Sequence, residues 1–242
     1  MHPTLNLQQL GIALAVEDFH PQTLTPEILQ YSGIIESDWK LARQPICTSE
    51  FSQVIFANGI AIVAQPQKVT FVEAIADKTV EEVLVPAMVR KYVATLPQIN
   101  YLAIRINPSG YVVFDSQRDA ARQYITKTLL SPGAWQEVGA PMRASINLTY
   151  PLERCDFNLT VEEAVLRQPD ETTTPVVVFG GSFKYRMAAN SGIEKQASIE
   201  QAIASWQVDL TTYTEIVNNK FLAAGNEPSA VIPNVLAMSA KG

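Results

Sequence analysis

Histidine and cysteine are scarce in this sequence, with two residues of each among 242. His20 lies in a turn-like stretch between Asp18 and Pro21, and neither histidine belongs to a His-Glu-x-x-His motif. Cysteine pairs separated by two residues are also missing, although zinc sites commonly use that spacing. The sequence therefore predicts no metal site, no cofactor and no histidine-based catalysis.

Motifs that bind phosphate or activate a serine nucleophile are missing as well. The chain has no glycine-rich loop ending in Lys-Ser or Lys-Thr, no Gly-x-Gly-x-x-Gly and no Gly-x-Ser-x-Gly. The Gly180-Gly181 pair lies between strand-like residues, so we expect a bulge or bend there and no anion-binding turn. We name no catalytic residue and favour a non-catalytic protein.

Positive charge and long apolar runs are limited too. Lysine and arginine total 18 against 24 acidic residues, which gives a formal net charge of −6. This balance argues against a nucleic-acid partner, because phosphate recognition needs clustered cations. No run approaches the roughly 18 apolar residues of a membrane span. Cys47 and Cys155 are interpreted as reduced, buried thiols, and without a charged-then-apolar leader we expect a cytoplasmic protein.

Apolar periodicity predicts the order strand, helix, strand, strand, helix, strand in the first half of the chain. Asn58-Gly59 is typical of a hairpin turn, and Thr79 with Glu82 forms a capping box before a helix that Pro86 must kink or restart. We expect Pro108 to begin a turn between two further strands. This order is the ferredoxin-like β-α-β-β-α-β plan.

The second half predicts antiparallel strands followed by one long helix. A capping box at Ser198 opens this helix, whose apolar stripe includes Ile203, Trp206 and Tyr213. We therefore predict an α+β protein with two antiparallel sheet layers, each covered by helices and meeting near residues 131–142. The predicted units are a ferredoxin-like half at 1–130, a sheet with the long helix at 143–226, and an apolar C-terminal arm at 227–242.

Arg105 is the cation that most invites a functional interpretation. It stands between Ile104 and Ile106 and so faces away from their apolar stripe. A structural ion pair with Glu73 or Glu17 is the favoured interpretation, and recognition of an anion is the alternative. Leu102 to Asn107, with Arg105, Ile106 and Asn107 in order, resembles a strand of an uncharacterised, sporadically distributed bacterial family. The overall order of elements also resembles conserved hypothetical proteins of cyanobacteria. The resemblance implies a fold and brings no activity.

We interpret the protein as a non-catalytic interaction or assembly component. Its partner would be an unidentified protein or a second copy of the chain, and we expect neither nucleic acid nor membrane as a partner. The apolar arm would pack on its own domain or dock on a partner. The alternative is a small-molecule binding protein or enzyme that uses a cleft between the halves. The candidate binding residues of that cleft are Tyr101, Arg105, Asn107, Tyr185 and Arg186.

Overall fold

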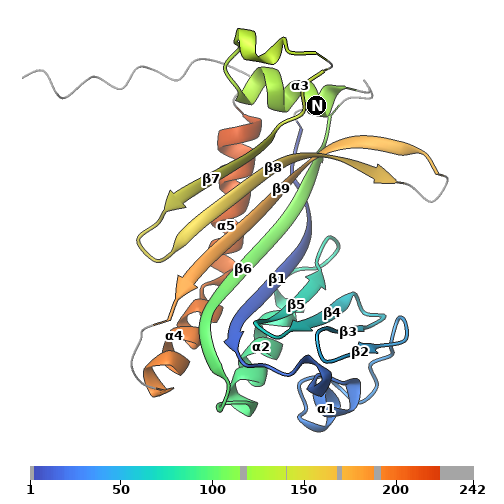
Figure 1. Cartoon of the computed structure of the whole chain (residues 1–242), viewed down its shortest axis with the longest axis vertical. Helices are drawn as coiled ribbons and strands as arrows, with labels where there is room; N and C mark the ends of the chain where they lie inside the picture. Colours follow the sequence, from blue (N-terminus) through green and yellow to red (C-terminus); the bar gives the residue numbers. More distant parts are fainter. Residues whose placement is uncertain (1–2, 115–118, 140, 168–170, 188–191, 224–242) are drawn as a thin grey trace, which may run out of the picture.

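The computed structural model describes residues 3–114, 119–139, 141–167, 171–187 and 192–223. Within these ranges the protein is α+β, and nine strands form one antiparallel sheet in the order β2-β3-β4-β5-β1-β6-β9-β8-β7 (Figure 1). The strands are β1 (Asn6–Glu17), β2 (Ile46–Cys47), β3 (Ser52–Ile55), β4 (Ile60–Gln65), β5 (Lys68–Ala74), β6 (Asn100–Val113), β7 (Ser145–Pro151), β8 (Asp156–Arg167) and β9 (Thr173–Arg186).

The helices pack on one face of this sheet. In Figure 1, strands β7, β8 and β9 pass in front of α5, while α2 packs on β1 and β5 and α4 on β6. The helices are α1 (Pro26–Tyr31), α2 (Val85–Thr95), α3 (Ala120–Gln123), α4 (Gly192–Ala204) and α5 (Trp206–Ile216). Three short 3₁₀ helices are η1 (Pro21–Thr23), η2 (Val80–Glu82) and η4 (Ala134–Gln136), and two π-helical segments are η3 (Tyr124–Leu129) and η5 (Val217–Leu222). No helix in the described ranges is long and apolar enough to cross a membrane.

The prediction of two sheet layers is wrong. Strand β6 pairs with β1 along one edge and with β9 along the other, so the strands of both predicted halves share one ladder of hydrogen bonds. The ferredoxin-like plan also fails, because the chain between α1 and α2 forms four strands, of which β5 pairs antiparallel with β1. The predicted joint at 131–142 lies between η3 and β7. The predicted arm at 227–242 falls outside the described residues.

The turn predicted at Pro108 is absent, because β6 continues through this residue as a single strand. Pairing between β6 and β9 is interrupted after Ile106 and resumes at Ser109 in the same register. Proline has no N–H to donate, so the ladder loses bonds at Pro108 without ending. Gly181 makes room for it, since a Cβ there would lie 3.0 Å from Pro108 Cγ and 2.9 Å from the Tyr213 ring. The glycine pair therefore permits close packing inside β9, and its pairing with β8 continues without a bulge.

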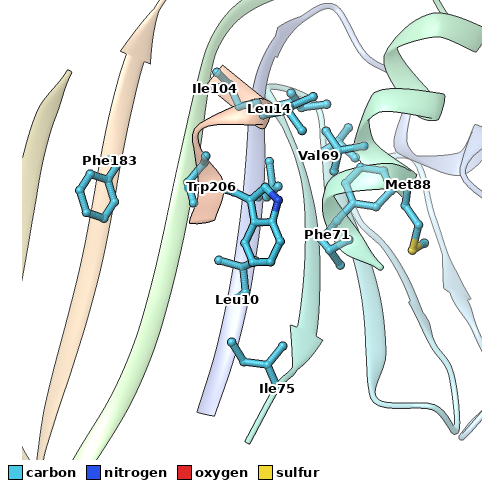
Figure 2. Close-up of a cluster of buried hydrophobic side chains, with 14 of the residues drawn as sticks. Leu10, Leu14, Val69, Phe71, Ile75, Met88, Ile104, Phe183 and Trp206 are labelled. Atoms are coloured by element: carbon cyan, nitrogen blue, oxygen red, sulfur yellow. The ribbon is translucent and has the colours of Figure 1, made fainter. Parts of the chain in front are cut away.

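The long predicted helix is two helices separated at Ser205. Ser198 lies inside α4 and donates its hydroxyl hydrogen bond to the Glu194 carbonyl, so it is not the predicted cap. The buried positions are nevertheless confirmed: Ile203, Trp206 and Tyr213 are all buried. Figure 2 shows Trp206 beside Leu10 and Leu14 of β1, within the single core under the helices.

Several predictions drawn from local sequence signals are confirmed, in contrast to the predicted arrangement of the sheet. The β3–β4 hairpin turns at Asn58-Gly59, with Gly59 in the left-handed region at φ 83°. The capping box forms too, as the Thr79 amide donates to Glu82 at 2.7 Å, and the chain restarts as α2 with Pro86 in its first turn. Cys155 is buried as predicted, whereas Cys47 is exposed because β2 is a short strand at the edge of the sheet.

Candidate functional site

The middle of the sheet carries a trough on the face opposite the helices. Strand β1 places large apolar side chains toward the helices, whereas Gly11, Ala13 and Ala15 alternate with them on the other face. Longer side chains on β5 and β6 stand on both sides of these small residues. The resulting trough has a volume of 760 Å³ and is lined by Ala13, Ala15, Gln65, Pro66, Gln67, Lys68, Thr70, Arg105 and Asn107.

Strand register places four cations around this trough. In one row across the sheet, Ala15 is paired with Lys68 on β5 and with Ala103 on β6, and Ala103 is paired with Arg186 on β9. Directly paired residues point to the same face, so Lys68 and Arg186 flank the row of alanines.

The adjacent row carries the other two cations. Ala13 is paired with Arg105 on β6, and Arg105 is paired with Lys184 on β9. We call the surface formed by Lys68, Arg105, Lys184 and Arg186 the basic face. Neighbouring strands lie about 4.8 Å apart, so the four cations span about 15 Å from β5 to β9.

Arg105 and Lys184 form no direct ion pairs with the described residues, although Asp156 of β8 is the register partner of Lys184. Neither side chain forms an ion pair with any residue that the structure describes, although they stand directly opposite each other. Like charges at such positions weaken the pairing of two strands. Arg186 does contact Asp156, at 3.3 Å between Nη2 and Oδ2, but the Arg186 side chain is 78% exposed, and a pair with so exposed a partner contributes little. The basic face therefore keeps a net positive charge in an acidic protein.

The ion pair predicted for Arg105 does not form. Glu73 is fully buried on the helix-covered face, where it accepts a hydrogen bond from the Lys78 ammonium at 2.7 Å. Two backbone amides at the N-terminus of α2 also donate to its carboxylate, each at 2.8 Å. The Glu17 carboxylate instead accepts a hydrogen bond from the side-chain amide of Asn100 at 2.5 Å. The acids were assigned to Arg105 wrongly because their sequence positions do not reveal on which side of the sheet they point.

The five predicted binding residues divide between the two faces. Arg105, Asn107 and Arg186 belong to the uncovered face, the first two of them in the trough. Tyr101 is buried and donates its hydroxyl hydrogen to the Leu96 carbonyl at 3.1 Å, while Tyr185 is buried and donates to Asp209 at 2.8 Å. The five residues therefore do not form one cleft.

The sequence interpretation missed Lys68 and Lys184. Both lie on strands whose partners could not be read from composition or alternation. One signal was present: three small residues, Gly11, Ala13 and Ala15, alternate with large apolar ones along β1. Such a pattern indicates that one face of the strand is packed and that the other face carries only small side chains.

A second polar cluster joins α5 to the sheet. Asp209 is fully buried and receives hydrogen bonds from Tyr185 and from Arg154, whose Nη2 lies 2.8 Å from Oδ1. Burial raises the pKa of Asp209, and the hydrogen bonds from Arg154 and Tyr185 oppose that shift. Burial also raises the pKa of the nearby Cys155 thiol, which does not favour a reactive thiolate. Because Arg154 and Tyr185 both donate hydrogen bonds to Asp209 and so attach α5 to the sheet, we interpret the cluster as structural.

The trough offers charge and hydrogen bonds to a ligand. Its lining side chains include two cations, Lys68 and Arg105, together with amide groups and one hydroxyl. In the described part of the chain, no three His, Cys, Asp or Glu side chains lie close enough together to hold a metal ion. No protein-family model matches the chain and no curated protein matches it, so the family resemblance noted above stays a prediction.

Proposed function

We propose that this protein is a non-catalytic interaction protein that binds an acidic, extended segment of a partner protein on its basic face. The observation that supports this function is the pair of Arg105 and Lys184, which stand opposite each other beside a trough lined by alanine and form no ion pair with the described residues. Two like charges directly opposite each other weaken strand pairing. A carboxylate bound beside the two cations would be attracted to both of them and would offset their mutual repulsion.

An acidic peptide suits the shape of the site as well as its charge. The cations occupy two neighbouring rows and span about 15 Å, which an extended chain of about five residues covers. Arg105 offers a planar fork that can donate two hydrogen bonds to one carboxylate, and Asn107 and Thr70 add neutral groups beside it. The wide, open face accepts a chain that crosses the strands.

The test is fluorescence anisotropy with a labelled ten-residue peptide in which glutamate alternates with serine. We expect the full-length protein to bind this peptide and to bind the version with glutamine in place of glutamate at least tenfold more weakly. Affinity should also fall as salt rises, because exposed charges are screened. Equal binding of both peptides, or no binding of the glutamate peptide at low salt, would refute the proposal.

Matched variants locate the interaction. Arg105→Gln and Lys184→Gln should each weaken binding about five- to tenfold, which corresponds to about 1–1.4 kcal/mol. Arg90→Gln is the control, because Arg90 is also exposed but lies on α2 and pairs with Glu200. It should leave the affinity unchanged. A ten-nucleotide thymidine strand serves as a second competitor, and tighter binding of that strand than of the peptide would contradict the assigned partner class.

A further inference from the structure

A second concavity lies between α1, the end of β1 and the C-terminal end of α2, close to α1 in Figure 1. We call it the α1–α2 pocket. Its volume is 580 Å³, a size typical of small-molecule sites. Most of its walls are apolar, and these walls include Phe19, Leu24, Ile28, Leu29, Leu96 and Ile99.

The walls of the α1–α2 pocket are held in place by hydrogen bonds to the sheet and its turns. The Phe19 amide donates to the Pro66 carbonyl at 3.1 Å, and the buried Ser52 hydroxyl donates to the Leu24 carbonyl at 2.8 Å. Leu24 and Leu29 are 3% and 1% exposed, so they line the pocket from the interior of the protein. The fold therefore forms the pocket before a ligand binds, which lowers the cost of binding.

Ile28 of α1 gives the pocket an apolar side chain that the fold leaves partly in water. It lines the pocket and is 48% exposed. Single exposed apolar residues are common on protein surfaces, but this one belongs to a concave site whose other walls are also mainly apolar. An apolar ligand in the pocket would remove part of this side chain from water, which is favourable.

The charged groups at the rim of the α1–α2 pocket are of both signs. Glu17 and Asp18 line the pocket, together with Asn100. The Asn100 side chain donates to the Glu17 carboxylate at 2.5 Å and accepts from the Lys195 ammonium at 2.8 Å. A ligand carboxylate would be opposed by the two acids, and a ligand ammonium by Lys195. The rim therefore favours a ligand without charge.

We propose that the α1–α2 pocket binds a neutral aliphatic molecule of the medium-chain alcohol type. The alkyl chain lies among the leucine and isoleucine side chains, and the hydroxyl group stays at the rim, where Gln98 offers an exposed amide. This site shares no residue with the basic face, so it stands or falls independently of the function proposed above.

Displacement of the neutral fluorescent probe N-phenyl-1-naphthylamine from the full-length protein tests this ligand class. The competitors 1-decanol, decanoate and decylamine share one alkyl chain and differ in charge. We expect 1-decanol to displace the probe at micromolar concentration and each charged analogue to require at least fivefold more. Replacing 1-decanol by 1-octanol should weaken binding about tenfold, because two fewer methylene groups are buried.

Two substitutions on α1 and its C-terminal cap locate the site. Ser32 lines the pocket, so Ser32→Trp should fill part of it and weaken binding of 1-decanol at least tenfold. Ile28→Asn should weaken binding about fivefold, because it removes an apolar wall. The controls are Tyr31→Trp and Val138→Asn, at residues that are 95% and 80% exposed and lie outside the lining of the pocket. Both controls should leave binding unchanged.

Ile28→Asn changes a half-exposed side chain, so it should keep the melting temperature of the wild-type protein and carry the test if Ser32→Trp does not fold. The proposal is overturned if the probe or 1-decanol fails to bind up to its solubility limit. It is also overturned if decanoate or decylamine displaces the probe as well as 1-decanol does, or if folded Ile28→Asn protein binds 1-decanol with unchanged affinity.

Discussion

Replacing Arg105 by glutamine should stabilise the protein, although it removes a charged side chain. Arg105 faces Lys184 directly and has Lys68 and Arg186 on the same face. Two exposed unit charges about 7 Å apart repel each other by about 0.6 kcal/mol in water, and the more distant cations add a few tenths each. We therefore expect Arg105→Gln to raise the free energy of unfolding by about 0.5–1 kcal/mol at low salt.

Urea denaturation at two salt concentrations measures this effect. The gain should shrink to about half or less at 0.15 M salt, because the Debye length there is about 8 Å. Arg90→Gln is the control of opposite sign, since loss of its ion pair with Glu200 should cost up to about 1 kcal/mol. A loss of more than about 1 kcal/mol for Arg105→Gln at both salt concentrations would mean that Arg105 stabilises the fold, and the argument for a binding role would fail.

Three further substitutions test the interior. Glu73→Gln should lower the free energy of unfolding by about 3–5 kcal/mol in urea titrations, because it leaves Lys78 without its buried partner, and a loss under 1 kcal/mol would contradict this. Trp206→Ala should cost about 3–5 kcal/mol in the same assay, as expected for a buried aromatic residue, and a near-neutral result would place Trp206 outside the core. Asp209 has a raised pKa, so its contribution to stability is present below its ordinary pKa of about 4 and is lost as pH rises through the raised value. Relative to Asp209→Asn, the wild-type protein should lose stability as pH rises from about 4, and the opposite slope would refute this.

The sequence predicted many elements but not their arrangement. The short apolar run from Leu10 to Val16, followed by charged residues, identified β1, and Asn58-Gly59 identified the β3–β4 turn, because both signals are local. The pairing of β6 with β9 joins segments about 70 residues apart, and no local pattern specifies it. Pro108 misled the interpretation, since this proline lies inside a long strand, packed closely against Gly181 of the neighbouring strand.

The candidate site was predictable in the same partial way. Arg105 and Asn107 could be placed on the face opposite an apolar stripe from the alternation of β6 alone. Lys184 could not be joined to them, because its position beside Arg105 follows from the register of two distant strands. Tyr185 was misplaced for the related reason that it lies one residue further along β9, and successive residues of a strand face opposite sides.

The most direct test of the central claim is a nuclear magnetic resonance titration of the isotope-labelled protein with the glutamate–serine peptide. The account predicts that amide shifts concentrate on the uncovered face, at Ala13, Ala15, Thr70, Arg105 and Lys184, and that they vanish when Arg105 and Lys184 are both glutamine. Shifts confined to the helices, or an unchanged response in the double variant, would contradict the assignment of the basic face as the binding surface.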